Sequence, residues 1–259
     1  MQKLVFLIKF GERQYMERFA SGHLYFSNAL KFREIETSLM IKGQGDKLEG
    51  ASKIFTTDFK VTNINTDEDI LSGKNMILHA NYAPANKLPV FCIMCCYESD
   101  CKKISENVIR IELQGDIIKD IQDHFPKADT GAVVLKPYTF IEDVENYFSG
   151  GCKNGQVNYF NINGITSITG TVGDMEYFKY LCQDIPPKKV DNKTVKSFNA
   201  KYVYRALLCK DVFFKNEQEY RLIVTTIEIE APKEFDIKLN TKIKLFRLND
   251  FIKGINVDI

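Results

Sequence analysis

The chain has 259 residues, of which 44% are hydrophobic and 12% aromatic, enough apolar material for one large domain or two small ones. Its 35 lysines and arginines nearly balance 34 aspartates and glutamates, and a net charge of +1 argues against a dedicated nucleic-acid binder, though not against a local basic patch. No apolar stretch approaches the ~20 residues of a membrane span, and the opening apolar segment is too short for a signal peptide. We therefore expect a cytoplasmic protein with no membrane partner.

The first half of the chain predicts short strands separated by short helical segments. Apolar residues at helical spacing indicate a helix over 11–21, closed by Gly22 at the position of a C-terminal cap. Glycines and polar residues over 37–51 indicate a loop. Strands are predicted at 3–9, 23–27, 52–64, 75–82, 88–98 and 107–113, with a helical turn at 28–35.

The second half continues the same mixture of elements. Helices are predicted at 115–125, 139–148, 174–181 and from 249, strands at 131–135, 235–238 and 242–246, a hairpin over 156–172 that turns at 163–164, and a polar connector over 183–196. Strands outnumber helices and do not alternate with them regularly, so we expect an α+β fold of mixed, mostly antiparallel sheets with peripheral helices. One domain over 1–259 is expected, in which 115–196 could be an inserted middle segment.

Seven cysteines, an odd number, fit a reducing compartment better than a disulfide framework. Cys92, Cys95, Cys96 and Cys101 lie close together, which could suggest a zinc site. Three of them fall within an apolar run that predicts a buried strand, however, and no second pair has zinc-ribbon spacing. We therefore expect these cysteines to be reduced, largely buried and free of metal.

Residues 210–226, with the sequence KDVFFKNEQEYRLIVTT, are the most informative stretch. They place two carboxylates immediately before the apolar, β-branched run of a buried strand. Side chains at a spacing of two share one face of a strand, so Glu217, Glu219 and Arg221 should line up, with Tyr220 on the opposite face. Such a row could serve a site that handles a developing positive charge or a polar ligand. It could equally be a salt-bridge ladder on a half-exposed strand.

A second group of polar and aromatic residues lies near the start of the chain. It comprises His23-x-Tyr25-Phe26-Ser27, Phe32-Arg33 and Gly45-Asp46-x-x-Glu49-Gly50. Asp46 and Glu49 could bind a cation or a ligand hydroxyl, or they could cap and solvate a mobile loop. Arg33 could hold a phosphate, or it could pair with Glu36 three residues later.

Together, the two groups resemble a large, mostly uncharacterised bacterial family that is often encoded beside phage-defence and abortive-infection genes. That family combines a Leu-Tyr-Phe-Ser strand, an aromatic residue and an acidic loop with a late Lys…aromatic…Glu-x-Glu-aromatic-Arg strand. The matching positions here are Leu24 to Ser27, Phe32, Asp46, Glu49, Lys210, Phe214, Glu217, Glu219, Tyr220 and Arg221. The resemblance covers the two ends, roughly a third of the chain, and its motifs are specific only in combination.

That family in turn looks like the ADP-ribosyltransferase-like fold, which implies NAD as the substrate. By this resemblance Glu219 would hold the ribose 2′-hydroxyl and stabilise an oxocarbenium-like centre, and Glu217 would orient the acceptor. The residues implied to meet NAD are Tyr25, Ser27, Lys9, His23 and Arg221. The chain departs from the pattern on its first strand, which has Lys9 as its only cation, while His23 opens the second strand instead.

Three functions remain open from the sequence. The first is an NAD-dependent, ADP-ribosyltransferase-like effector, a toxin or phage-defence protein, that cleaves the nicotinamide–ribose bond and modifies a protein or nucleic-acid acceptor. The second is a non-catalytic defence protein that binds a nucleotide or a phage component. The third is a metal-dependent nuclease that uses Asp46, Glu49, Glu217 and Glu219. The first two predict that Glu217 and Glu219 lie on one strand and face the same cleft as Tyr25 or Ser27.

Overall fold

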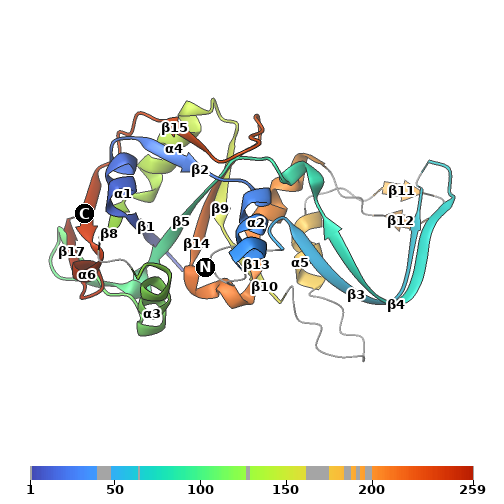
Figure 1. Ribbon diagram of the computed structural model, residues 1–259, viewed down its shortest axis with the longest axis horizontal. Helices are drawn as coiled ribbons and strands as arrows, with labels where there is room; N and C mark the ends of the chain where they lie inside the picture. The colour runs from blue at the N-terminus through green and yellow to red at the C-terminus, as the bar shows by residue number, and fades with distance from the viewer. Residues whose placement is uncertain are drawn as a thin grey trace.

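The computed structural model describes residues 2–39, 48–63, 65–126, 129–161, 175–183, 188–190, 193–195 and 200–258. A six-stranded sheet forms its centre, and every neighbouring pair of strands in it is antiparallel (Figure 1). In spatial order the strands are β16 (Ile243–Arg247), β8 (Thr130–Leu135), β1 (Leu4–Glu12), β5 (Val90–Tyr97), β14 (Glu219–Val224) and β9 (Cys152–Gln156). The predicted α+β class with mostly antiparallel sheets is confirmed.

One face of this sheet packs against two helices and a strand pair. They are α1 (Arg13–Ala20), α4 (Pro137–Tyr147), and β2 (His23–Phe26) paired with β15 (Lys233–Asp236). Phe26, Phe91 and Phe140 meet in the core between them, with ring centroids 5.4 to 5.8 Å apart in the contacting pairs. Gly22, at φ +95°, makes the turn between α1 and β2, and a Cβ there would lie 2.3 Å from the Ile237 carbonyl oxygen.

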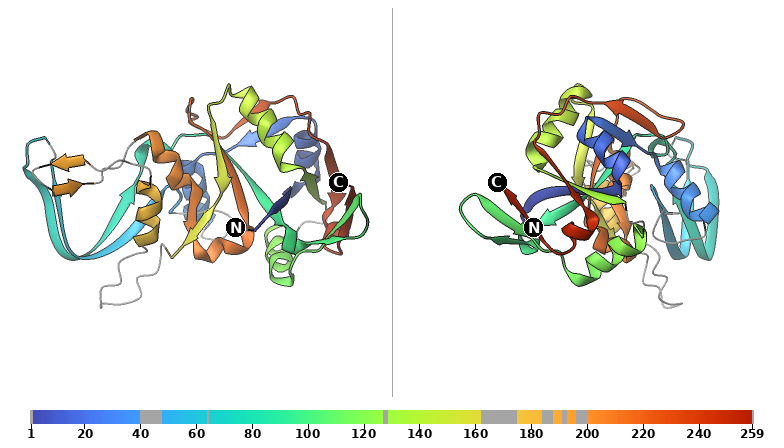
Figure 2. Two further views of the ribbon diagram at one scale, coloured as in Figure 1. Left: turned by 180° about the vertical axis from the view of Figure 1, so that it is seen from behind. Right: turned by 60° about the vertical axis from the view of Figure 1, so that its left-hand side comes forward.

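The opposite face carries two separate groups of elements (Figure 2). Over β1 and β8 lie α3 (Gly115–His124), α6 (Leu248–Phe251) and a small sheet of β17 (Ile255–Asp258), β7 (Val108–Ile111) and β6 (Cys101–Lys103). Over β5 and β14 lie α2 (Ala29–Leu39) and the 3-10 helices η1 (Ala83–Ala85) and η3 (Ala200–Leu208). The candidate site lies on this face, between the two groups.

The connection between β13 and β14 places residues at that site. The strands β10 (Asn158–Phe160) and β13 (Cys209–Asp211) form a parallel pair, and the 3-10 helix η4 (Val212–Glu217) leads from β13 into β14. The 3-10 helix η2 (Glu98–Asp100) joins β5 to β6. The side chain of Asp211 accepts a hydrogen bond from the Phe213 amide at 3.0 Å and so caps the start of η4.

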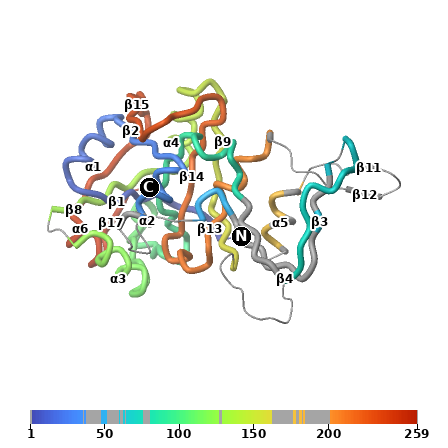
Figure 3. Tube along the Cα trace, turned by 45° about the vertical axis from the view of Figure 1, so that its right-hand side comes forward, coloured from blue at the N-terminus to red at the C-terminus, as the bar shows by residue number. Residues whose placement is uncertain are grey.

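A long two-stranded arm leaves the body of the molecule (Figures 1 and 3). It consists of β3 (Ala51–Thr62) and β4 (Asp69–Asn81), which pair with each other and, within the described chain, with no third strand. The short elements α5 (Met175–Cys182), β11 (Lys188–Val190) and β12 (Lys193–Val195) lie toward the same end of the molecule. No helix in the described ranges is long and apolar enough to cross a membrane.

Several predicted elements need correction. The helical turn expected at 28–35 is a longer helix, α2, which continues to Leu39 and takes up the start of the predicted loop. The hairpin expected over 156–172 is wrong in its described part, because β9 pairs with β14 and β10 pairs with β13. Its turn at 163–164 lies outside the described residues. Residues 115–196 supply β8 and β9, which are both strands of the central sheet.

Candidate functional site

Glu217 and Glu219, together called the late acidic motif, belong to two different elements. Glu219 and Arg221 begin β14 on the cavity face, and Tyr220 packs into the opposite core, as the strand period predicts. Glu217 does not belong to this strand, contrary to the sequence prediction. It ends η4, and Gln218 turns the chain with a left-handed φ of 44° between the two acids. Glu217 therefore reaches the site from a different backbone direction than Glu219 does.

Arg221 is the centre of a buried ionic cluster. Its Nε and Nη2 atoms donate to the two carboxylate oxygens of Glu219 at 2.9 and 3.0 Å. Its Nη1 and Nη2 atoms donate to the two oxygens of Glu49 at 2.5 and 2.9 Å, and Nη1 also donates to the Leu207 carbonyl at 2.6 Å. A guanidinium has five N–H donors, so all of them are committed inside the protein. The side chains of Arg221 and Glu49 are each 1% exposed.

Lys210 extends this cluster toward the solvent. Its ammonium lies 2.5 Å from Glu217 Oε2 and 3.4 Å from Glu219 Oε2, and it lies over the Phe214 ring. The side chain of Glu217 is 31% exposed, whereas that of Glu219 is 7% exposed. No described residue is seen to bond Glu217 Oε1. Glu217 is thus the carboxylate of the late motif that retains access to solvent.

The two carboxyl groups of the late motif have oppositely shifted pKa values. Burial raises the pKa of Glu217, and the negative charge of Glu219 adds to this, while Lys210 offsets only part of it. Burial also disfavours the ionised form of Glu219, but the charges of Arg221 and Lys210 outweigh it and hold the pKa of Glu219 well below its usual range. Glu219 is therefore held as an anion, and Glu217 is the more easily protonated of the two.

A cavity of about 1100 Å³ opens in front of this cluster. One wall is α3 with the segment that follows it, and another is η4, and the Asn216 side chain joins the two by donating to Asp120 Oδ2 at 2.9 Å. Its aromatic lining consists of Phe10, Tyr15, Phe32, Phe125, Phe213 and Phe214. A volume of this order and a mainly apolar lining with a few convergent polar groups are typical of small-molecule sites.

The structure brings some of the predicted site residues together here. Besides Glu217, Glu219 and Arg221, the cavity is lined by Lys9, Phe32 and Glu49. The ammonium of Lys9 donates to the Cys92 carbonyl at 2.6 Å. The early acidic motif and the late strand, far apart in sequence, are therefore joined by the Glu49–Arg221 ion pair. Asp46 lies outside the described residues.

Other predicted site residues do not line this cavity. Tyr25 is 60% exposed on β2, and Ser27 exchanges two backbone hydrogen bonds with Val90 at 2.8 and 2.9 Å. The predicted convergence of these two residues with the Glu-x-Glu motif is therefore not seen. Arg33 donates to the Asn86 side chain at 2.5 Å.

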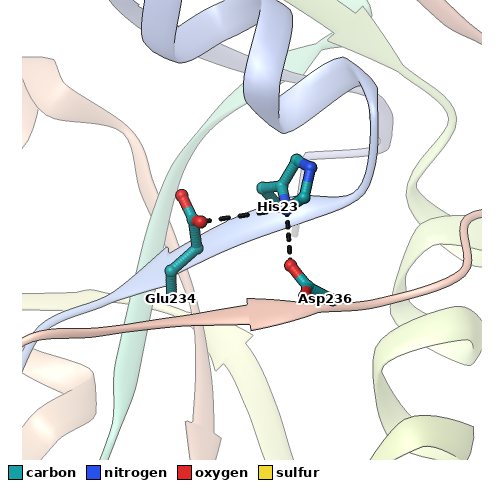
Figure 4. A group of neighbouring side chains, drawn as sticks. All are labelled: His23, Glu234 and Asp236. Atoms are coloured by element: carbon teal, nitrogen blue, oxygen red, sulfur yellow. Dashed lines mark hydrogen bonds and ion pairs between the residues drawn. The ribbon is translucent and has the colours of Figure 1, made fainter.

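His23 takes part in a separate cluster on the β2–β15 pair (Figure 4). Its Nδ1 lies 2.5 Å from Asp236 and 3.8 Å from Glu234, and these three side chains are close enough together to hold a metal ion. Both carboxylate oxygens of Glu234, however, already accept hydrogen bonds from the Arg18 guanidinium. An ion would have to displace this arginine, so we interpret the cluster as a surface ion-pair network.

Sequence reasoning missed the contribution of α3, and of Phe213 on η4, to the site. Asp120, His124, Phe125 and Phe213 line the cavity, although none of them stood in a recognised motif. The signal that the sequence offered was the pair of adjacent aromatic residues Phe213 and Phe214, of which Phe213 is 55% exposed in the structure. Besides Arg221 and Lys210, Tyr159 also contacts the acidic motif. Its hydroxyl oxygen accepts a hydrogen bond from the Glu219 amide at 2.8 Å.

Comparison with known proteins adds no relative: no family model matches the chain, and neither the curated proteins nor the solved structures give a significant match.

Proposed function

We propose that the cavity binds a nucleoside-type ligand, with a flat ring and a hydroxyl-bearing sugar, and that Glu217 is the carboxylate that acts on it. The observation that carries this proposal is the contrast between two neighbouring acids in one cavity. Glu219 is locked as an anion by Arg221 and Lys210, while Glu217 retains an accessible oxygen and a raised pKa. Neighbouring carboxyls whose pKa values are pushed apart commonly divide the roles of proton carrier and fixed charge.

The resemblance to ADP-ribosyltransferase-like enzymes makes NAD the first ligand to test. In that reaction the bond between C1′ of the ribose and the nicotinamide nitrogen breaks, and its electron pair leaves with neutral nicotinamide. The oxocarbenium-like centre is captured by an oxygen nucleophile, and Glu217 would take the proton that the nucleophile loses. On this proposal the protein is an effector of phage defence or a toxin, and its acceptor is water or a hydroxyl of another macromolecule.

A non-catalytic binding protein is the second candidate, and one observation favours it. The carboxylate that the resemblance assigns to the ribose, Glu219, has both oxygens held by Arg221. Its side chain is also only 7% exposed, so a ligand hydroxyl has little access to it. The nuclease alternative is less well supported, because a divalent ion would have to displace Arg221 from Glu49 and Glu219.

Nicotinamide release from NAD and transfer of label from NAD in a cell lysate test the proposal. We expect Glu217→Gln to lower the rate by about 10²–10³-fold, the usual loss for one electrostatic contact at a reacting centre, and a cooperative thermal transition confirms that the variant is folded. Glu98→Gln is the matched control, because its side chain is 70% exposed and lies outside the cavity lining. Glu219→Gln should instead lower the thermal midpoint, because it weakens the buried cluster.

The outcomes separate the candidates. A Glu217→Gln variant as active as the parent would remove the assigned role. NAD that binds to the parent without being cleaved would favour the binding protein. A parent that neither binds nor cleaves NAD, nor binds any nucleoside-type probe, would contradict the proposed function as a whole.

A further inference from the structure

In the described lining of the cavity, acidic side chains outnumber basic ones, and the basic ones are engaged by the protein. Its described lining carries five carboxylates against three lysine and arginine side chains. The acids are Glu12, Glu49, Asp120, Glu217 and Glu219, and the bases are Lys9, Lys210 and Arg221. The described lining therefore has more acidic than basic side chains.

Each of the three cations is already engaged by the protein. Arg221 has its five donors on Glu49, Glu219 and the Leu207 carbonyl. Lys210 is shared between Glu217 and Glu219. Lys9 donates to a backbone carbonyl and lies 5.3 Å from the centroid of the Phe91 ring. A phosphate that entered the cavity would meet Arg221 and Lys210 already paired with carboxylates, and Lys9 held by a carbonyl and an aromatic ring.

The walls of the cavity favour a cationic ligand over an anionic one. Aromatic faces attract organic cations, and a partly buried carboxylate strengthens that attraction. Phe213 and Phe214 stand on the same 3-10 helix as Glu217, with their rings 5.0 Å apart in an edge-to-face arrangement. Asp120 lies on the facing helix, joined to η4 through Asn216. A cationic ring seated here would meet aromatic surface and negative charge together.

We propose that this cavity receives the cationic or uncharged half of its ligand and leaves any phosphate outside, an inference that rests on the proposed function. A phosphate that enters this described lining, where carboxylates outnumber cations, loses its hydration and gains little net counter-charge, so its entry is unfavourable. For NAD this means that the nicotinamide–ribose half enters and the pyrophosphate stays at the mouth. The substrate class is thus a glycoside whose base carries a positive charge or no charge while it is attached to the sugar. The cavity recognises it without its phosphates.

Calorimetric titration of the full chain with four probes tests this inference: NAD, nicotinamide riboside, ADP-ribose and AMP. We expect nicotinamide riboside, which is cationic and has no phosphate, to bind within about tenfold of NAD. AMP and ADP-ribose should bind at least about tenfold more weakly than nicotinamide riboside. Raising the salt concentration should weaken nicotinamide riboside binding, because the attraction is between opposite charges.

A charge reversal on α3 supplies a matched pair of variants. Asp120→Lys adds a cation to the cavity wall and should shift the preference toward AMP by about tenfold or more. Asp123→Lys makes the same change on the same helix outside the cavity lining and should leave the preference unchanged. Circular dichroism and thermal unfolding of both variants confirm that they are folded.

Three outcomes overturn the inference in different ways. If AMP or ADP-ribose binds as tightly as NAD and nicotinamide riboside does not bind, the inference fails, while a nucleotide-binding function still stands. If none of the four probes binds, the proposed function fails and the inference fails with it. Equal shifts in Asp120→Lys and Asp123→Lys would show that the preference arises from overall charge and not from this cavity.

Discussion

Arg221 ties the first and last thirds of the chain together through Glu49, and the contact is fully buried. A buried charge pair is not in itself a source of net stability, but removing one partner leaves the other charged and desolvated. The cluster is also a frame for Glu217, because Lys210 is held between Glu217 and the Arg221-bound Glu219. The loss of Arg221 should therefore affect both stability and the site.

We expect Arg221→Met to lower the free energy of unfolding by about 3–5 kcal/mol, the range typical of a broken buried pair. Urea unfolding followed by circular dichroism measures this change. Arg13→Met is the matched control: Arg13 makes an exposed ion pair with Glu17, so its loss should cost less than about 1 kcal/mol. Equal stabilities of parent and Arg221→Met would show that the cluster contributes nothing that an apolar side chain cannot replace.

At this scale the sequence located part of the site. The strand period placed Glu219 and Arg221 on one face and Tyr220 on the other, and the two acidic motifs that define the resemblance are joined by an ion pair. The position of Glu217 could not be predicted, because a left-handed Gln218 carries no sequence signal of the kind that glycine would give. The lining residues on α3 depend on a contact between distant segments, which local periodicity does not reveal.

At the scale of elements, the β3–β4 arm differs from the other strands. Strands β1, β5, β8 and β14 each have a neighbour on both sides, whereas among the described residues β3 and β4 pair only with each other. Two-stranded ribbons are marginally stable in water, since neither a third strand nor a layer of helices covers them. Both strands were predicted from sequence, but their isolation was not, because the sequence does not say which strands share a sheet.

We expect the backbone amides of the arm to exchange with deuterium about 100-fold faster than those of β5. Hydrogen exchange followed by mass spectrometry of peptides from the two regions measures the ratio. Strand β5 is wholly apolar, whereas β3 and β4 mix apolar with polar residues, so the ratio reports burial and strand neighbours together. Protection of the arm equal to that of β5 would indicate that another surface covers it in solution.

At the scale of the whole molecule, the opposite pKa shifts of the two acids should shape the dependence of stability on pH. An unfolded glutamate loses its proton near pH 4.3, about the value for a free side chain. Folded Glu217 keeps its proton to a higher pH, so above about pH 4.3 the folded state binds more protons and the free energy of unfolding falls as pH rises. Glu219 acts oppositely: its contribution is present above about pH 4.3 and is lost as the pH falls through its lowered folded pKa.

We therefore expect Glu217→Gln to remove part of the decline in stability on the alkaline side of pH 4.3, leaving the acid side unchanged. Urea unfolding of parent and variant between about pH 4 and pH 8 measures the difference. Burial also raises the pKa of Asp100, which contributes a similar decline in both proteins, so the difference between the two curves is the informative quantity. Parallel curves would show that Glu217 titrates normally in the folded state.

The order of strands in the central sheet fixes when the candidate site can first assemble during synthesis. Strand β14 lies between β5 and β9, although it is made long after both. During synthesis, therefore, one edge of β5 has no strand partner, and Glu49 has no counter-ion, until the segment that contains Arg221 leaves the ribosome. The acids and the cation that shape the cavity come together only when most of the chain has been translated. A nascent chain that has not yet reached Arg221 therefore lacks the ionic cluster that shapes the cavity.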